Sequence, residues 1–456
     1  VSTGIPAVRI VGLPDAAVGE ARERIRSAIR ASGFTWPARR ITVNLAPADL
    51  RKSGGSFDLA IALGILAASG QLRLGDRSVA AVGELALDGA LSRVPGVLPA
   101  AVAAMAAGRG LICPAACGSE AALSGLGAGD ADADRPVILA APSLLALINH
   151  LRGQQVLPPP KAELADDGVT YPDLAEIKGQ ESAKRVLEVA AAGGHNLLMV
   201  GPPGSGKSML AARLPGILPP LTPREMLETS MVASLAGELH AQGVSRRRPY
   251  RAPHHSASSV ALVGGGSPPR PGEISLALHG VLFLDELPEF RRQALEALRE
   301  PLENQCITVS RAARQMEYDA DFQLIAAMNP CPCGQLGAPH RQCRCTPDQV
   351  SRYQSRLSGP FLDRIDLHIE VPLLAAQEVL QLSPEESTAL VRERRVRARQ
   401  RALQRQGCCN ARLSVAHMHT LPWSDSAREA LQTSAQRLGL SARAIHRSWR
   451  VAMTIA

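Results

Sequence analysis

The sequence predicts an α/β protein with an N-terminal α+β unit, a phosphate-binding α/β core and a helical C-terminal region. Three observations support this fold class. From about residue 173 to 375, apolar strand patterns alternate with helical patterns, which indicates a parallel sheet. Residues 1–150 mix short strands with apolar helices, and helical patterns dominate residues 376–456. The Pro-rich, polar stretch 151–172 is typical of a linker between the first unit and the core.

Within the first unit, the segment DAAVGEARERIRSAIRASG predicts an amphipathic helix. Asp15 can cap its start, apolar residues recur at helical spacing, and Gly33 ends it. PAVRIVGLP and ITVNLAP have strand patterns, and VAAVGELALDGAL predicts a hairpin with an Asp-Gly turn. Two apolar helices are expected in FDLAIALGILAASG and VPGVLPAAVAAMAAG.

The C-terminal region carries an arginine-rich helix, VRERRVRARQRALQR, whose arginines spread around the helix rather than along one face. The last residues, VAMTIA, lie inside a helical pattern, so we expect this helical region to be truncated. A solvated lid helix and a DNA-contacting helix are both compatible with this pattern.

Composition limits the classes of function. The 456 residues allow two to four domains, and 46% hydrophobic content excludes a disordered chain. A net charge of +8 favours an anionic partner, nucleic acid first, and 3% aromatic content favours backbone contacts over base stacking. Apolar runs of about ten residues are too short to cross a membrane. No export signal opens the chain, and nine clustered cysteines fit a reducing cytoplasm.

The strongest motif joins an apolar strand, NLLMV, to the phosphate loop GPPGSGKS and a following helix. Backbone N–H groups of such a loop surround phosphate oxygens, the lysine reaches the β- and γ-phosphates of ATP, and the serine ligates Mg²⁺. The loop comprises Gly201, Pro202, Pro203, Gly204, Ser205, Gly206, Lys207 and Ser208.

Two further buried strands end in polar residues. GVLFLDEL ends in Asp285, a candidate Mg²⁺ ligand, and Glu286, a candidate general base for the attacking water. FQLIAAMNP ends in Asn329, whose amide can hydrogen-bond the γ-phosphate or that water. The phosphate loop and these residues predict an ATPase.

A cysteine-rich insert follows at 331–345, with the spacing C-x-C, nine residues, C-x-C. Zinc knuckles commonly use C-x₂₋₄-C, so the spacing departs from that pattern. Structural Zn²⁺, free buried thiols and redox chemistry all remain open, with His340 as a spare ligand. We hypothesise that the insert braces the loop after Asn329. The candidate ligands are Cys331, Cys333, Cys343 and Cys345.

Several long runs resemble the magnesium-chelatase-like AAA+ ATPases of the ComM/YifB type. They include RAPHHSASSVALVGGGSPPRPGEISLALHGVLFLDELPEF, MNPCPCG and RLSGPFLDRIDLHIEVP, together with IVGLPDAAVGEARERIRSAI near the N-terminus. The resemblance covers nearly the whole chain. It implies a cytoplasmic, hexameric ATPase that moves on DNA, associated with branch migration in DNA uptake and recombination. It also implies a Lon-like, ribosomal S5 domain-2 fold for residues 1–150 and a helical lid for 376–456.

The resemblance assigns roles to further residues. Arg364 in PFLDRID matches the arginine finger, which reaches a neighbouring subunit's γ-phosphate, and Arg356 is the alternative. Arg443 matches the sensor-2 arginine of the lid. The adenine-side loop before the phosphate loop corresponds to Ile177, Lys178, Gly179 and Gln180.

In this branch of AAA+ proteins, inserts line a central pore, where arginines would hold phosphate backbone without reading sequence. One insert is SRRRPYRAPHH, and ITVSRAARQMEYDA reads as a hairpin. Without carboxylate or cysteine partners in spacing, His254 and His255 are expected in a polar loop rather than at a metal. The candidate DNA contacts are Arg246, Arg247, Arg248, Arg311 and Arg314.

Three functions therefore compete. The leading one is a DNA-translocating ATPase, and the second is the motor subunit of a metal-chelatase or protein-remodelling complex. The third is an ATP-driven Lon-like protease, with Ser56 at the nucleophile position. Leu98 occupies the place of the expected catalytic lysine, and a serine without its base is not activated, which disfavours proteolysis.

Overall fold

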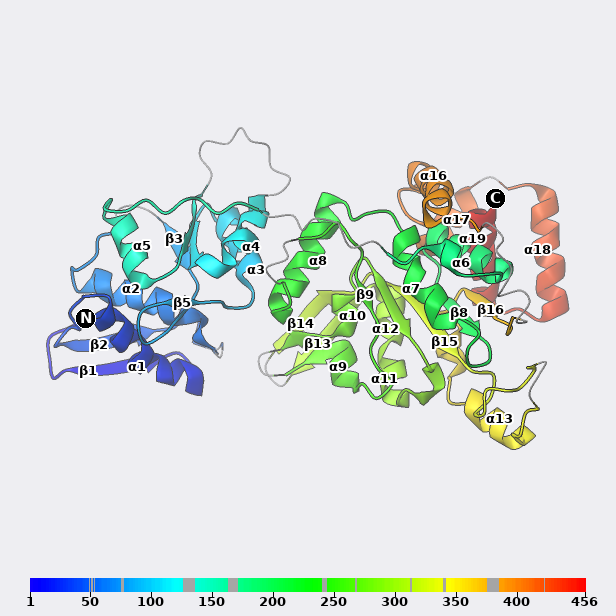
Figure 1. Cartoon of the computed structure of the whole chain (residues 1–456), viewed down its shortest axis with the longest axis horizontal. Helices are drawn as coiled ribbons and strands as arrows, with labels where there is room; N and C mark the ends of the chain where they lie inside the picture. The colour runs from blue at the N-terminus through cyan, green and yellow to red at the C-terminus, as the bar shows by residue number, and fades with distance from the viewer. Residues whose placement is uncertain are drawn as a thin grey trace. The chain divides into compact units, whose positions relative to one another are not determined.

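The computed structural model describes residues 1–48, 50, 52, 54–74, 78–125, 136–162, 171–239, 244–266, 269–311, 314–338, 342–374, 385–421 and 423–456 (Figure 1). The predicted α/β class is confirmed. Internal contacts divide the chain into two compact units, residues 1–166 with 222–246 and residues 167–221 with 247–456. Among the helices of the described residues, none has the length and apolarity of a membrane span.

A parallel sheet of five strands organises the second unit. Its spatial order places the strand before the phosphate loop beside the strand that ends at Asn329. Polar residues that follow parallel strands meet at one edge of the sheet. In spatial order the strands are β16 (Leu367–Glu370), β8 (Leu197–Val200), β15 (Gln323–Met328), β12 (Val281–Leu284) and β9 (Tyr250–Arg251).

Both faces of this sheet are buried because successive side chains of each strand point to opposite sides. Val281 and Phe283 of β12 pack into one hydrophobic core, while Leu282 and Leu284 pack into the other. The first core is covered by α6 (Glu181–Gly193), α7 (Lys207–Ile217) and the lid helix α16 (Thr388–Gln406).

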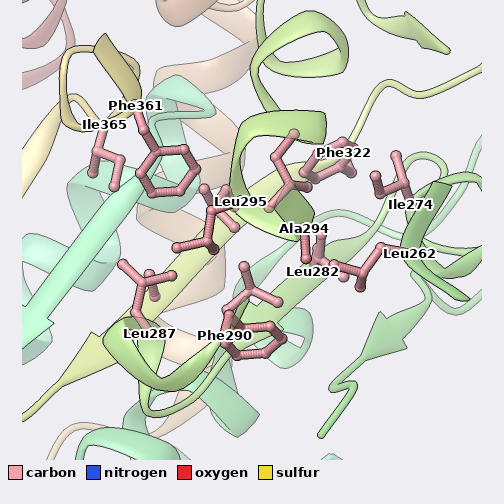
Figure 2. Close-up of a cluster of buried hydrophobic side chains, with 14 of the residues drawn as sticks. Leu262, Ile274, Leu282, Leu287, Phe290, Ala294, Leu295, Phe322, Phe361 and Ile365 are labelled. Carbon is pink, nitrogen blue, oxygen red and sulfur yellow. The ribbon is translucent and has the colours of Figure 1, made fainter. Parts of the chain in front are cut away.

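The second core lies beneath short helices and a hairpin. Figure 2 shows some of its members, including Phe361 and Ile365, which flank Arg364, and Leu287 and Phe290, which follow Glu286. Both of these chain segments are thus anchored in one core. The covering elements are α9 (Ser259–Val263), α10 (Glu273–Leu276), α11 (Arg292–Ala297), α12 (Arg299–Asn304), β13 (Cys306–Arg311), β14 (Arg314–Asp319) and α14 (Gly359–Leu362).

The remaining helices of the second unit follow the strands in sequence. Helix α13 (Pro347–Gln354) begins at Thr346 in a capping box with Gln349. The C-terminal helices are α17 (Val415–Thr420), α18 (Asp425–Leu438) and α19 (Ala442–Ile455), and the side chains of Trp423 and Trp449 stack between them.

The first unit contains small sheets and apolar helices. Strand β1 (Ala7–Val11) runs parallel to β2 (Arg40–Asn44), and β6 (Gly110–Pro114) lies between β3 (Val79–Ala81) and β7 (Ile138–Ala141). The predicted hairpin is short: β4 (Glu84–Leu85) pairs with β5 (Leu91–Ser92). The helices are α1 (Ala16–Ala31), α2 (Asp58–Ala68), α3 (Val97–Ala106), α4 (Gly118–Ala122) and α5 (Leu144–Leu151).

One helix of the first unit comes from a distant part of the chain. Helix α8 (Pro223–Ala236) follows the phosphate-loop helix in sequence yet packs on α3. The buried Ser234 hydroxyl donates to Glu120 Oε1, and the Leu98 amide donates to the same carboxylate at 3.2 Å. Gly96 N donates to the Ser234 carbonyl at 2.9 Å. Buried polar groups that pair in this way specify how α8 docks.

Candidate nucleotide-binding site

The phosphate loop joins β8 to α7 at the sheet edge where the neighbouring strand β15 also ends. Gly201 N donates to the Met328 carbonyl at 3.1 Å, which ties the start of the loop to the end of β15. A side chain at Gly201 would come within 2.2 Å of the Val371 carbonyl oxygen, so only glycine fits there. Gly204 and Gly206 have φ values of +82° and +90°, which glycine adopts without strain.

Lys207 is the first residue of α7, and its side chain is buried. Its ammonium donates to the carbonyls of Gly201 at 2.7 Å and Pro202 at 2.9 Å, and lies 3.5 Å from Asn329 Oδ1. Burial lowers the pKa of Lys207, while the charge of Asp285 acts in the opposite direction. The side chains of Lys207 and Asn329 thus converge on one place at the sheet edge.

Ser208 and Asp285 also come together. The Ser208 hydroxyl donates to Asp285 Oδ2 at 2.6 Å. A serine hydroxyl beside a carboxylate at a phosphate loop is the oxygen donor set that binds Mg²⁺ in phosphoryl-transfer sites. The donor chemistry of these two residues therefore fits Mg²⁺.

Glu286 follows Asp285 in an uncommon backbone conformation. Its φ of +53° lies in the left-handed region, which non-glycine residues rarely adopt. The Glu286 N–H donates to Asp285 Oδ1 at 2.9 Å, and its carbonyl accepts from Glu289 N at 2.8 Å. Strained residues of this kind cluster at functional sites.

The loop assigned by resemblance to the adenine side, residues 177–180, contacts the segment before α16. Ile177 is buried in the core beside α6, and Gly179 N donates to Glu385 Oε1 at 3.2 Å. Glu385 also pairs with Lys184 at 2.5 Å, and this hydrogen bond lowers the pKa of Glu385. Gln180 donates to the carbonyls of Ser205 and Pro372, at 3.2 Å and 2.7 Å. Lys178 belongs to the same loop.

The lid meets this loop through a second contact. Asp173 Oδ1 accepts hydrogen bonds from Ala175 N at 3.0 Å, Thr388 N at 2.8 Å and the Thr388 hydroxyl at 3.0 Å. Thr388 is the first residue of α16. The backbone hydrogen bond from Ala175, followed by that from Thr388, lowers the pKa of Asp173.

His255 reaches the site although sequence reasoning placed it in a polar loop. His255 Nδ1 lies 2.9 Å from Glu286 Oε2. The neighbouring His254 instead pairs through Nδ1 with the Ser256 hydroxyl at 2.8 Å. The sequence gives no signal of this contact, because His255 and Glu286 are 31 positions apart and are brought together only by the tertiary fold.

The two arginines assigned by resemblance lie elsewhere in the second unit. Arg364 forms an ion pair with Glu303, and the Glu303 carboxylate also lies 3.8 Å from Arg443. Arg364 and Arg443 line a cleft of about 400 Å³, whose other arginines are Arg412, Arg447 and Arg450. Arg356, the alternative finger, pairs instead with Glu289 at 2.9 Å.

The four cysteines of the insert form a compact cluster. Their sulfur atoms all lie within 4.8 Å of one another, and three of the separations are 3.5, 3.7 and 3.7 Å. A tetrahedral Zn²⁺ with bonds of about 2.3 Å separates its sulfur ligands by about 3.8 Å. Hydrogen bonds from the backbone of Arg344 and Gln335 lower the pKa of Cys333 to about 6, which favours thiolate. His340 lies outside the described residues.

The cysteine cluster touches the phosphate loop. Gly334, in the turn after Cys333, has a φ of +75°, and a Cβ there would lie 2.6 Å from Pro203 Cδ. The same Cβ would lie 3.7 Å from the Asn329 side-chain carbon Cγ. The turn thus packs between the phosphate loop and Asn329.

The predicted DNA-contacting arginines have different surroundings. Arg246 is exposed, and the Arg247 guanidinium lies 5.3 Å from the centre of the Tyr171 ring. Arg248 is buried and donates to the carbonyls of Pro219 and His279, so its guanidinium is engaged inside the fold. Residues 311 and 314 pair in register at the end of the β13–β14 hairpin.

Comparison with known proteins defines the class. Residues 173–379 match the model described as magnesium chelatase, subunit ChlI; residues 1–117 match subunit ChlI of Mg-chelatase, and 385–456 match the ChlI C-terminal model. With its phosphate loop and parallel sheet, the chain is a magnesium-chelatase-like AAA+ protein, and this membership indicates an ATPase.

Full-length relatives define the family more closely. The chain is 47% identical to YifB of Salmonella typhimurium over 460 residues, covering 100% of the chain and 88% of the relative. It is 48% identical to the competence protein ComM of Haemophilus influenzae over 465 residues, covering 100% and 89%. A shorter match, 27% identical over 205 residues, covers 42% of the chain and 20% of the DNA replication licensing factor Mcm2 of Drosophila melanogaster. The chain belongs to the ComM/YifB family.

Proposed function

We propose that this chain is an ATP-driven motor that translocates on DNA and promotes branch migration as a homo-hexamer in the cytoplasm. One observation carries the proposal: Ser208 and Asp285 meet at 2.6 Å, beside the pair formed by Lys207 and Asn329. These groups would bind a nucleoside triphosphate and its Mg²⁺, and Glu286 follows Asp285 directly.

Each residue of the set has a role in hydrolysis. The phosphate-loop amides and Lys207 hold the β- and γ-phosphates, and Asn329 orients the γ-phosphate or the attacking water. Ser208 and Asp285 would hold Mg²⁺, which would neutralise part of the phosphate charge. Glu286 accepts the proton of the water as it attacks.

The arginine positions support an oligomeric enzyme. Arg364 and Arg443 share Glu303 as an ion-pair partner, whereas Lys207 contacts the phosphate loop of its own chain. We infer that both arginines serve the nucleotide of a neighbouring subunit, where they would stabilise transition-state charge. In a ring of subunits, every nucleotide site would receive Arg364 and Arg443 from the adjacent subunit.

Binding of single-stranded or branched DNA is inferred from charge and from relatives. The net charge is +8, Arg246 of the basic insert is exposed, and Arg311 pairs with Arg314 at the end of the β13–β14 hairpin. The names of two relatives refer to competence and to DNA replication licensing. We still propose that four arginines contact the DNA backbone: Arg246, Arg247, Arg311 and Arg314. Arg248 is no longer proposed, because its guanidinium binds carbonyls of the fold.

ATP hydrolysis measured with and without single-stranded, duplex and four-way-junction DNA tests the proposal, with Lys207→Ala as the inactive control. We expect DNA to raise the rate and the variant to lose hydrolysis. If ATP is hydrolysed but no DNA changes the rate at low salt, DNA translocation is wrong and a chelatase-type or protein-remodelling motor takes its place.

A Lon-like protease remains the weaker alternative. Leu98, at the position of the expected catalytic lysine, is a fully buried member of α3. We expect no casein cleavage by the protein with ATP, since a serine at position 56 would lack its activating base.

We also propose that the cysteine cluster holds one structural Zn²⁺. The sulfur separations fit a tetrahedral S₄ site, and four thiolates leave no open coordination position. Metal analysis of the purified protein should give about one zinc per chain, falling in Cys343→Ser but not in Cys306→Ser. A metal-free protein with unchanged thermal stability would refute the zinc proposal.

A further inference from the structure

We propose that Asn196 is a positioning residue for Arg364, because it holds the main chain of the proposed arginine finger against the sheet. The inference rests on the proposed action of Arg364 between subunits and deepens it. It begins from one side-chain amide that bonds in two directions. Asn196 Nδ2 donates to the Arg364 carbonyl at 3.0 Å, and Asn196 Oδ1 accepts from Leu324 N at 2.9 Å.

Asn196 lies at the amino-terminal edge of the parallel sheet, opposite to the edge that carries the nucleotide site. It immediately precedes β8, which lies between β15 and β16. Its side chain therefore reaches Leu324, the second residue of β15, on one side and Arg364, three positions before β16, on the other. The amide thus connects the finger to two strands of the nucleotide-binding sheet.

The main chain of Asn196 is itself fixed by residues that follow the finger. Its N–H donates to Asp366 Oδ2 at 3.1 Å, and its carbonyl accepts from Asp366 N at 3.1 Å and from Leu367 N at 3.0 Å. Because the backbone is held at both its donor and its acceptor, the side chain leaves a defined position. Its Nδ2 donor is directed at the carbonyl of Arg364.

The position of this carbonyl decides where the finger points. Arg364 lies in a turn whose neighbours Phe361 and Ile365 are buried in the core (Figure 2). The guanidinium is at the end of a long side chain, so a small rotation of the backbone displaces it further than the backbone itself. A misplacement of about 1 Å in a catalytic site can lower a rate about 100-fold.

Loss of the amide should affect Arg364 more than β15. Strand β15 pairs with β8 from Ile325 to Met328, so the ladder holds β15 without help from the Asn196 side chain. Arg364 belongs to no strand, and no ladder replaces the hydrogen bond at its carbonyl. Asn196 should therefore act on the nucleotide site of the neighbouring subunit, which receives Arg364, rather than on the site of its own chain.

The test uses mixed oligomers in which one kind of interface is active. Arg364→Ala subunits keep the phosphate loop and lack the finger, whereas Lys207→Ala subunits keep the finger and lack phosphate binding. Hydrolysis by the mixture therefore reports a finger donated by Lys207→Ala subunits to Arg364→Ala subunits. Asn196→Ala is added to the donor in one mixture and to the acceptor in another, with full chains mixed before assembly.

We expect Asn196→Ala in the donor to lower kcat of the mixture about 10- to 100-fold. The same substitution in the acceptor should leave kcat within about twofold, because the finger of that subunit is already absent. A general loss of folding or assembly would lower both mixtures alike. The asymmetry is thus the signature of a residue that acts through Arg364.

Two further variants control the measurement. Asn196→Asp can still accept from Leu324 N but cannot donate to Arg364, so it should repeat the asymmetry even if Asn196→Ala fails to assemble. Gln323→Ala removes another buried amide, which donates to carbonyls of α6 and of His195 rather than to Arg364. It should have equal effects in donor and acceptor. Size-exclusion chromatography checks that each mixture assembles.

An equal fall in the donor and acceptor mixtures would overturn the proposal, since Asn196 would then be a structural residue. A fall confined to the acceptor would also overturn it, because the role would belong to the nucleotide site of the same chain. If the parent mixture of Arg364→Ala and Lys207→Ala is inactive, the proposed action of Arg364 between subunits fails, and the inference falls with it. An active parent mixture with an unaffected donor refutes the role of Asn196 alone.

Discussion

At the scale of single residues, the side chains of the candidate site are fixed by contacts with the backbone. Lys207 donates to two carbonyls of its own loop, and Asp285 accepts from both Ser208 and the Glu286 amide. Such contacts hold the groups near the geometry needed for phosphoryl transfer, which reduces the reorganisation required during reaction.

Replacing Glu286, the proposed general base, should lower the rate of hydrolysis while leaving nucleotide binding intact. Glu286→Gln keeps the size of the side chain but cannot accept a proton, so we expect kcat for ATP hydrolysis to fall about 100-fold or more. Nucleotide binding, measured by fluorescence of a labelled ATP analogue, should be retained. Glu289→Gln, three residues later, is the matched control, and hydrolysis by Glu286→Gln within twofold of the wild type would exclude this role.

Asp173 should make stability dependent on pH. Its pKa is lowered in the folded chain by hydrogen bonds from Ala175 and Thr388, so its stabilising effect is complete above the unfolded pKa of about 3.9. That effect is lost as the pH falls through the lower folded pKa. Urea unfolding should show Asp173→Asn less stable at neutral pH, with the difference shrinking towards about pH 3. An equal difference at both pH values would contradict the assignment.

Residue-level prediction from sequence depends on local signals. The phosphate loop and the acidic strand end are read from contiguous residues, and the structure brings Ser208 and Asp285 together. It missed His255, because a histidine in a loop carries no mark of its tertiary partner. Sequence also treated Arg248 as a DNA contact, whereas its partners are carbonyls of the fold.

At the scale of elements, the turn that carries Gly334 links the cysteine cluster to the phosphate loop. Gly334 and Gly337 both adopt left-handed backbone, with φ of +75° and +78°. A Cβ atom at Gly334 would lie 2.6 Å from Pro203 Cδ. A Cβ atom at Gly337 would have no neighbour within 4 Å among the described residues, so of the two glycines Gly334 is the one packed against the phosphate loop.

This pair of glycines provides an internally controlled experiment. Both alanine variants should lose about 1 kcal/mol of stability from the strained backbone. Gly334→Ala should in addition displace Pro203 and raise the KM for ATP severalfold, whereas Gly337→Ala should leave KM unchanged. Melting temperatures and ATP kinetics measure the two effects. Equal KM values in both variants would show that the turn does not brace the phosphate loop.

Helix prediction followed local patterns in the same way. Asp15 caps α1 through a hydrogen bond to Val18 N at 2.8 Å, and the apolar positions at helical spacing are buried. The packing of α8 on α3 could not be predicted from the sequence. It depends on contacts between segments separated by more than 100 residues, such as Ser234 with Glu120.

At the scale of the whole molecule, the proposed role of Arg364 as an arginine finger predicts complementation between defective subunits. Arg364→Ala should lower kcat about 1000-fold, because the transition-state charge loses its counter-ion. Lys207→Ala should be inactive for lack of phosphate binding. Mixed before assembly, the two variants should hydrolyse ATP faster than either alone, since Lys207→Ala subunits supply Arg364 to intact phosphate loops.

Arg356→Ala replaces Arg364→Ala in the control mixture, because Arg356 is the alternative finger and, like Arg364, forms an ion pair within its own chain. We expect Arg356→Ala alone to retain most of the wild-type rate. If the mixture of Arg364→Ala and Lys207→Ala stays as inactive as its components under conditions where hexamers form, Arg364 does not act between subunits.

Helix α8 also constrains the order in which the protein can mature during synthesis. Because α3 occupies residues 97–106 and its partner α8 occupies 223–236, the ribosome must translate the phosphate loop before the N-terminal unit can close. Domains usually fold as they emerge, N-terminal first. Until α8 has been translated, the surface of α3 that binds it stays uncovered, and translation arrest between residues 166 and 222 would leave it so.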